Sequence, residues 1–305
     1  MPAYNGARFI AEAIESVRAS TFRDFELLVL DDGSTDDTLK IIEQQIAQDA
    51  RVRCVQLAHG GVAKARNAAL REAQGEFIAN LDADDATFPE RFARQVAFLD
   101  AHPDCIAVGG RALVVDAKGA PVGVVIRVFS HDEIDAWHME GRGGGLGNPM
   151  AMFRKQAALD IGGYTTSTEQ TGEDYDLWLR LAEKGRLENL RDVLIRYRVH
   201  SDNVSTQSAD QTHRLAVTHE ILKQAFTRRG ITDRTARRIE APALSSAEKL
   251  CDEALVLYFK GRRREALLRA LTACVHNPTA AGTRHTLRTV LAGAPPAWKT
   301  PSTPL

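Results

Sequence analysis

Residues 25–38 read FELLVLDDGSTDDT, and this stretch decides the fold of the chain. The run Glu26–Leu30 is short and apolar after its first residue, which is typical of a buried strand, and Asp31-Asp32-Gly33 then form a turn. Ser34-Thr35-Asp36 can cap a helix that continues to about residue 48. A strand that turns directly into a helix is the unit from which parallel, helix-covered sheets are built.

The same unit repeats along the next part of the chain. Val52–Leu57 is predicted to be a second strand, and Gly60-Gly61 breaks the chain before a helix over 62–73. Glu76–Leu81 is predicted to be a third strand, which ends in the acidic run 82–85. Since ligands of such sheets bind beyond the carboxyl ends of the strands, both acidic clusters are expected at the binding edge.

The beginning of the sequence departs from this pattern. Residues 8–20 place apolar side chains at helical spacing, but Pro2-Ala3-Tyr4-Asn5 leads straight into that helix. We therefore expect the first strand to be truncated or missing. One hypothesis is that the start codon lies inside a longer reading frame, and an in-frame stop directly before Met1 in the DNA would contradict it.

The second half of the chain predicts further strands and then helices. Strands are expected within 105–130, and the glycine-rich GRGGGLG at 141–147 predicts a mobile loop without regular structure. From about residue 206 the pattern is helical, with a helical hairpin broken at Gly261 and a loose, proline-rich tail over 293–305. The expected organisation is a catalytic domain at 1–205 followed by a helical region at 206–305.

The composition is that of an ordinary soluble globular protein. The 305 residues include 39 Lys and Arg, 40 Asp and Glu, and 44 % hydrophobic residues. This balance excludes a disordered chain and disfavours general nucleic-acid binding, which usually needs a basic excess. The four cysteines lie far apart, without metal or redox spacing, and neither a signal peptide nor a membrane span is predicted. A cytoplasmic protein is therefore expected.

Each acidic cluster has a structural and a functional interpretation. Asp82-Ala83-Asp84 can aim two carboxylates at Mg²⁺ or Mn²⁺, or it can be a solvated turn before the next helix. Asp31-Asp32 can be a helix cap, but a second acidic cluster on the same edge favours a cation or a donor ligand. The acidic residues of Glu173-Asp174-Tyr175-Asp176 either stabilise a helix N-terminus or supply a general base. His200 is either a structural residue or a metal ligand.

Three common catalytic motifs are not found. The chain has no G-x-x-x-x-G-K-[ST] motif, which disfavours a P-loop nucleoside triphosphatase, and no G-x-S-x-G motif, which disfavours a common serine hydrolase. GRGGGLG is not a dinucleotide-binding loop, because Leu146 stands where the third glycine is needed.

Seven segments together resemble glycosyltransferase family 2, the inverting enzymes of the GT-A fold. They occur in the family's order over about residues 1–205, and they are PAYNGARFIAEAIESV, FELLVLDDGSTDDT, GGVAKARNAAL, GEFIANLDADD, MFRKQAALDIGGY, GEDYDLWLRLA and YRVHSDNVS. The resemblance implies an α/β, Rossmann-like sandwich with a mostly parallel central sheet. Residues 206–305 would then be a variable helical extension.

The resemblance also implies roles for individual residues. The donor would be bound by Pro2, Ala3, Tyr4, Asp32, Arg66 and Asp82. Tyr4 would stack on the base, and Asp32 would accept the imide N–H of uracil, which suits a UDP-sugar. A Mn²⁺ or Mg²⁺ ion would be held by Asp82, Asp84 and His200. Asp174 would be the general base, and Glu173 and Trp178 would contact the acceptor.

The implied activity is metal-dependent transfer of a sugar, with inversion, to a hydroxyl of a polysaccharide or other glycoconjugate. A nucleotidyltransferase-like enzyme and a glycosyltransferase-like binding protein without turnover are the alternatives. Basic clusters at 228–229, 234–238 and 260–264 are either a solvated helical surface or a docking face for an anionic membrane. Docking would fit a lipid-linked acceptor and a peripheral position at the inner face of the membrane.

Overall fold

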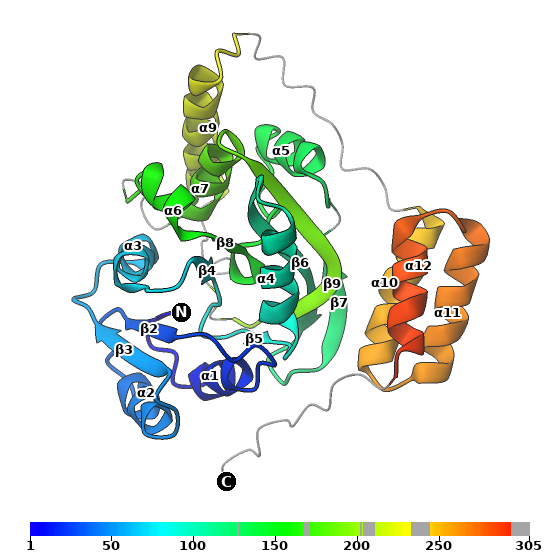
Figure 1. The fold of residues 1–305 in the computed structure, drawn as a ribbon, viewed down its shortest axis with the longest axis horizontal. Helices are drawn as coiled ribbons and strands as arrows, with labels where there is room; N and C mark the ends of the chain where they lie inside the picture. Colours follow the sequence, from blue (N-terminus) through cyan, green and yellow to red (C-terminus); the bar gives the residue numbers. More distant parts are fainter. Residues whose placement is uncertain (127, 167–170, 202, 204–210, 233–244, 294–305) are drawn as a thin grey trace.

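The computed structural model describes residues 1–126, 128–166, 171–201, 203, 211–232 and 245–293. It has the expected α/β fold, with two sheets, the helices that cover them, and a group of C-terminal helices beside the second sheet (Figure 1).

Sheet A consists of three parallel strands in the order β1 (Pro2–Ala3), β2 (Leu27–Asp31) and β3 (Val52–Gln56). Every residue of β2 is buried, because helices cover both of its faces. Leu27 and Val29 pack toward α1 (Ile10–Arg18) and α2 (Thr38–Ile46). Leu28 and Leu30 pack toward α3 (Val62–Glu72). The continuous apolar run of β2 is thus explained by burial on two sides.

A first strand is present but very short, so the expectation of a truncated strand is confirmed and that of a missing strand is wrong. It comprises only Pro2–Ala3, which pair with Leu30 and Asp31, and the Met1 amino group donates to Leu28 O at 2.8 Å. Two residues are too few for a hydrophobic pattern, which is why the sequence did not predict the strand.

Sheet B is mixed, and it contains the predicted third strand. Its order is β4 (Phe77–Ala79), β8 (Met152–Arg154), β6 (Cys105–Val115), β9 (Arg186–Arg198) and β5 (Ala86–Thr87), with β7 (Pro121–Val125) on β6. Of the strand pairs described in this sheet, only β6–β9 is parallel. The third strand pairs with β8 and with no described strand of sheet A, and residues of both β2 and β4 line a cavity of about 720 Å³.

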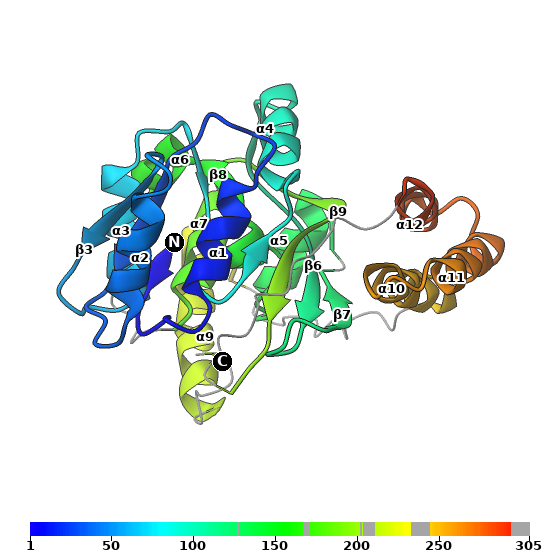
Figure 2. The ribbon, with the colours of Figure 1, turned by 90° about the horizontal axis from the view of Figure 1, so that it is seen from below.

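Four helices and a 3₁₀ turn accompany sheet B; the helices are labelled in Figures 1 and 2. They are α4 (Arg91–Ala101), α5 (His131–Met139), the 3₁₀ turn η1 (Asn148–Met150), α6 (Lys155–Asp160) and α7 (Glu173–Ala182). The glycine-rich segment 141–147 lies between α5 and η1 and has no regular structure, as predicted.

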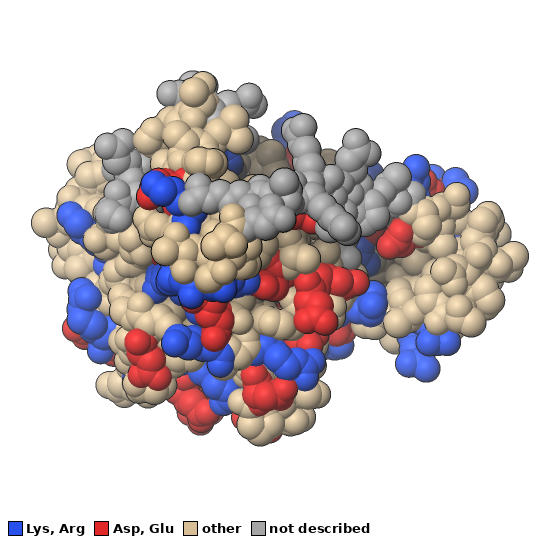
Figure 3. Space-filling model, turned by 90° about the horizontal axis from the view of Figure 1, so that it is seen from above, with Lys and Arg blue, Asp and Glu red and all other residues tan. Residues whose placement is uncertain are grey.

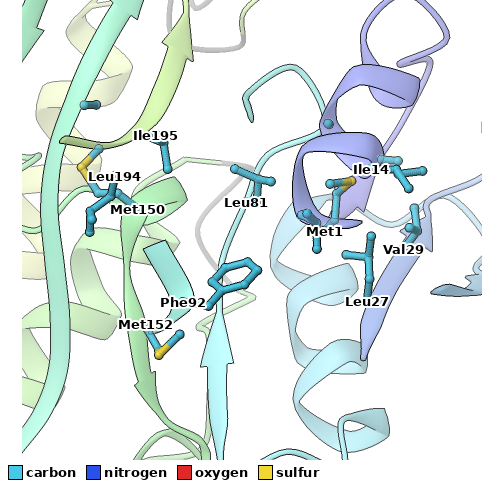
Figure 4. Close-up of a cluster of buried hydrophobic side chains, with 14 of the residues drawn as sticks. Met1, Ile14, Leu27, Val29, Leu81, Phe92, Met150, Met152, Leu194 and Ile195 are labelled. Atoms are coloured by element: carbon cyan, nitrogen blue, oxygen red, sulfur yellow. The ribbon is translucent and has the colours of Figure 1, made fainter. Parts of the chain in front are cut away.

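An apolar cluster joins the two sheets. Figure 4 shows Met1, Ile14, Leu27 and Val29 on one side and Met150, Met152, Leu194 and Ile195 on the other, with Leu81 and Phe92 between them. Leu81 directly precedes the acidic run 82–85, so this cluster fixes the start of that run between the sheets.

The C-terminal part is helical, as predicted. Helix α9 (Gln211–Arg228) packs on α7, while α10 (Ser246–Phe259), α11 (Arg263–His276) and α12 (Ala281–Leu291) share their own apolar cluster. Helices α10 and α11 form the predicted hairpin, whereas α12 was not predicted. Helix α10 contacts sheet B through Leu255, which packs on Leu113 and Val124.

Three predictions fall outside the described residues. They are the boundary near 205, the basic cluster at 234–238 and the proline-rich tail after Gly293. Within the described part of the chain, no helix combines the length and apolar character that crossing a bilayer requires.

Candidate functional site

The carboxyl end of β2 places Asp32 beside two exposed rings. The Asp32 carboxylate is buried and accepts hydrogen bonds from the N–H groups of Gly60 and Gly61, at 2.9 and 2.8 Å. His59 Nδ1 lies 3.0 Å from Asp32 Oδ2, and the His59 ring stacks on Tyr4 with 4.3 Å between ring centroids. Tyr4 is 49 % exposed. Sequence reasoning missed His59, since nothing in its local pattern links it to residue 4.

The turn after β2 holds the loop that carries Tyr4. The N–H groups of Asn5 and Gly6 donate to Ser34 Oγ and Thr38 Oγ1, at 3.0 and 2.8 Å. Ser34, expected only to cap the following helix, and Thr38 therefore tie the loop after β1 to the turn and helix that follow β2. Ala3 itself is 3 % exposed and pairs with β2, so its side chain belongs to the core.

The D-x-D run follows β4, and its first and third residues point to different partners. Asp82 Oδ1 accepts from Arg66 Nη2 at 3.0 Å. Asp84 Oδ2 lies 3.1 Å from His200 Nε2 and accepts from Asn203 Nδ2 at 3.0 Å. Burial, and then the nearby charge of Asp82, raise the pKa of Asp84. Asp84 and His200 are thus brought together as expected, whereas Asp82 is turned toward Arg66.

Asp85, the fourth residue of the run, is fully buried. Its Oδ1 accepts from the Arg198 N–H at 2.8 Å, and Arg198 Nε donates to Asp84 O at 3.0 Å. Burial, and then the charges of Asp84 and Asp82, raise the pKa of Asp85 well above its ordinary value. Asp85 therefore fixes the D-x-D run to β9 from inside the fold, a role that its sequence position did not reveal.

Arg66 on α3 connects the D-x-D run with the acidic start of α7. Its Nη1 donates to Glu173 Oε1 at 2.5 Å while Nη2 donates to Asp82, and both Arg66 and Glu173 are buried. Burial works to lower the pKa of Arg66, but the surrounding anionic groups, Asp82 first, raise it overall. One guanidinium thus fixes the spacing between two acidic segments that lie far apart in the sequence.

Asp174 lies in the first turn of α7, after Gly172 in a left-handed conformation with φ 80°. Burial raises the pKa of Asp174, and the Arg66 charge opposes this. Burial, and then the charge of Asp174, raise the pKa of Glu173. A carboxylate with a raised pKa beside a fixed cation has the properties required of a general base.

The residues present fit a divalent cation only in part. No group of three metal-ligating side chains in the described part of the chain is arranged to hold an ion. Two carboxylates, Asp82 and Asp84, do lie in one run, and Mg²⁺-type ions commonly use one or two carboxylates and take their other ligands from substrate phosphates. These two carboxylates therefore fit an ion whose other ligands are the phosphate oxygens of a bound diphosphate.

Two sequence expectations need correction. Trp178 is 1 % exposed and its ring packs edge-on against Phe153, so it is a core residue and does not reach an acceptor. Its place in the second turn of α7, three residues before the buried Leu181, could have indicated this. Arg228 and Arg229 form ion pairs with Glu183, and Arg229 also with Asp135, so they are engaged within the fold.

Known proteins resemble this chain over most of its length. The model of the family described as Glycosyl transferase family 2 matches residues 1–158. The putative glycosyltransferase EpsE of Bacillus subtilis (strain 168) is 34 % identical over 212 residues, which cover 68 % of this chain and 74 % of EpsE. A chondroitin synthase of Pasteurella multocida (strain Pm70) is 28 % identical over 229 residues, which cover 73 % of this chain but only 23 % of the synthase.

Two solved structures share the fold. S. aureus TarS 1–349 in complex with UDP-GlcNAc superposes with a TM-score of 0.56 at 21 % identity, and the superposition covers 95 % of this chain and 88 % of the TarS chain. The mannosyltransferase PcManGT of Pyrobaculum calidifontis, in complex with GDP-Man and Mn²⁺, superposes with a TM-score of 0.52 at 18 % identity. That superposition covers 91 % of this chain and 85 % of the PcManGT chain. Together with the family match and the strand-end acids, these likenesses show that the chain is a transferase enzyme of the GT-A fold and belongs to glycosyl transferase family 2.

Proposed function

We propose that this enzyme transfers a sugar from a nucleotide-diphosphate sugar, with UDP as nucleotide, to a hydroxyl group of a glycan or lipid-linked acceptor, with inversion at the anomeric carbon. The observation that carries the proposal is the Arg66 bridge, which holds Asp82 of the D-x-D run and Glu173, next to Asp174, on two sides of one guanidinium. Such a bridge sets the distance between a leaving diphosphate and a base.

The nucleotide is proposed to bind at the Tyr4 and Asp32 end of sheet A. The exposed Tyr4 ring offers a stacking face, and Asp32 Oδ1, which accepts the N–H of Gly60, keeps a lone pair for a further donor. The imide N–H of uracil is such a donor. TarS is described with UDP and UDP-GlcNAc, which supports a UDP-sugar, whereas PcManGT is described with GDP-Man.

Asp174 is proposed to take the proton of the acceptor hydroxyl as that oxygen attacks the anomeric carbon. The reaction is one displacement, so a carboxylate nucleophile is not required and an α-linked donor yields a β-linkage. Asp82, Asp84 and His200 would hold Mn²⁺ or Mg²⁺, and a bound ion of this kind neutralises the charge that develops on the departing diphosphate. Burial raises the pKa of Asp174, and the positive charge of Arg66 opposes that rise, which favours the ionised form.

The test begins with thermal unfolding of the chain with UDP, GDP or dTDP, each with and without Mn²⁺. A nucleotide at about 100 times its Kd adds about 2.7 kcal/mol of stability, and we expect this for UDP with Mn²⁺. Asp174→Asn should keep that shift and lose transfer from UDP-sugars by about 10²–10⁴-fold. Asp132→Asn, at the exposed start of α5, is the matched control and should stay active. Full activity of Asp174→Asn would contradict the base assignment, and no nucleotide shift would contradict the donor site.

The C-terminal helices are proposed to contact an anionic membrane. On α11 the side chains of Leu268, Leu271 and Val275 lie on one face and are 65 %, 46 % and 81 % exposed, and Arg263 and Arg264 are exposed at the start of the same helix. The lobe formed by these helices shows a largely uncharged surface in this view, with Lys and Arg, and some Asp or Glu, at its margins (Figure 3). An apolar face with basic residues at one end is typical of membrane-surface helices. Sedimentation with anionic vesicles tests this, and equal binding to neutral vesicles would count against it.

A further inference from the structure

The proposed base site is occupied by a side chain of the protein itself, that of His59. The His59 ring stacks on Tyr4 with 4.3 Å between the ring centroids and 26° between the ring planes. Its Nδ1 lies 3.0 Å from the backbone oxygen of Asp32 and 3.0 Å from Asp32 Oδ2. Both oxygens are acceptors, so Nδ1 carries the hydrogen and donates it. The imidazole therefore makes the two contacts that the proposed function assigns to uracil, a stack on Tyr4 and a donated N–H to Asp32.

The Asp32 carboxylate is covered in this arrangement. Its side chain is only 5 % exposed, because the N–H groups of Gly60 and Gly61 and the His59 ring lie against it. A base has to bring its N–H group to within about 3 Å of a carboxylate oxygen to donate to it. A group that covers Asp32 must therefore move before the base can bind. The His59 side chain is 51 % exposed, so there is open space into which it can turn.

The backbone that carries His59 is held in place, which confines the movement to the side chain. The N–H groups of Gly60 and Gly61 donate to the Asp32 carboxylate at 2.9 and 2.8 Å. Gly33, with φ 77° in the turn after β2, approaches closely from the other side, since a Cβ on it would lie 3.1 Å from the His59 nitrogen. Rotation about the side-chain bonds of His59 can thus uncover the base site while the loop keeps its contacts.

We infer that His59 competes with the nucleotide base for Tyr4 and Asp32, so that a uracil nucleotide binds only after the imidazole has turned away. The inference rests on the proposed function, because it takes these two residues as the base site. The apparent affinity is then reduced by the fraction of molecules in which the site is open. An open fraction of about one tenth would raise the apparent Kd of UDP about tenfold. His59 therefore opposes nucleotide binding, whereas an ordinary base contact would favour it.

The test measures the Kd of UDP by calorimetry, in the presence of Mn²⁺, for the parent chain and for His59→Ala. We expect His59→Ala to bind UDP about tenfold more tightly, because its base site is open from the start. His102→Ala is the matched control and should bind UDP like the parent chain. His102, at the C-terminal end of α4, also stacks on an aromatic ring, that of Phe98 at 4.2 Å, and its Nδ1 also lies close to a backbone oxygen.

Inorganic pyrophosphate serves as a second probe, because it has phosphates but no base. With Mn²⁺ it should bind His59→Ala no more tightly than the parent chain. A gain confined to UDP would therefore place the effect of His59 at the base rather than at the metal and the phosphates.

Unchanged or weaker UDP binding by His59→Ala would overturn the inference, since His59 would then be a bystander or a favourable base contact. An equal gain for pyrophosphate, or an equal gain for UDP in His102→Ala, would also overturn it. The proposed function fails in a different way. If neither the parent chain nor His59→Ala binds UDP, the donor site itself is wrong; if the parent chain binds UDP and His59→Ala gains nothing, only the competition by His59 is wrong.

Discussion

Removing the Arg66 guanidinium should destabilise the fold strongly, because it would leave a buried carboxylate without its cation. The side chains of Arg66 and Glu173 are each 8 % exposed and lie 2.5 Å apart. Breaking such a buried pair from one side costs about 3–5 kcal/mol. The Asp82 contact adds little, because that side chain is 33 % exposed and solvent screens its charge. Arg66→Met is therefore expected to lose about 3 kcal/mol or more.

Urea unfolding followed by circular dichroism measures this loss, and the melting temperature should fall by roughly 6 °C or more for a protein of this size. Arg71→Met is the matched control, since Arg71 is exposed on the same helix and should change stability by less than about 0.5 kcal/mol. The double variant Arg66→Met/Glu173→Gln should recover part of the loss, because it no longer buries an unpaired charge. If Arg66→Met unfolds like the Arg71 control, or if Glu173→Gln gives no recovery, the electrostatic argument is refuted.

Two further predictions concern the base and the close packing around Gly109 of β6. Burial raises the pKa of Asp174 above the ordinary value of about 3.9, and a general base must be deprotonated to act. The rate of transfer should therefore fall as the pH drops through that raised pKa. A kcat/KM profile that stays flat down to about pH 4 would contradict this. Gly109→Ala should lower the free energy of unfolding by about 1–3 kcal/mol, because the added Cβ would collide with Asn189 and Leu146. In the control Gly143→Ala the added Cβ meets no described atom within 4 Å, so this variant should have the melting temperature of the parent protein.

The sequence predicts the strand-turn-helix units well, because apolar runs and turn residues are local signals. The burial of β2 on both faces is visible in its composition, and the hairpin of α10 and α11 in its periodicity. The pairing of β4 with β8 is not visible, since it joins residues 77–79 to 152–154 through a register that no local pattern encodes.

In the candidate site, too, features with a local sequence signal could be predicted and contacts between distant segments could not. The acids at the strand ends could be predicted, because the carboxyl ends of strands lie at the binding edge of such sheets. The bridge from Arg66 to Glu173 and the stacking of His59 on Tyr4 could not, since they join side chains of different segments. Trp178 shows the opposite error: an aromatic residue near a catalytic acid was assigned to a ligand, although helical spacing places it in the core.

The separation of the two sheets has a consequence for how such enzymes diverge. No strand ladder among the described residues joins sheet A to sheet B; apolar packing and a few side-chain bridges, such as Arg66 to Asp82, do so instead. Substitutions that reshape one half therefore leave the strand register of the other intact. On the proposed function, the nucleotide contacts of Tyr4 and Asp32 belong to the sheet A half, so nucleotide preference is expected to vary independently of sheet B. Exchanging one half between related enzymes would test this.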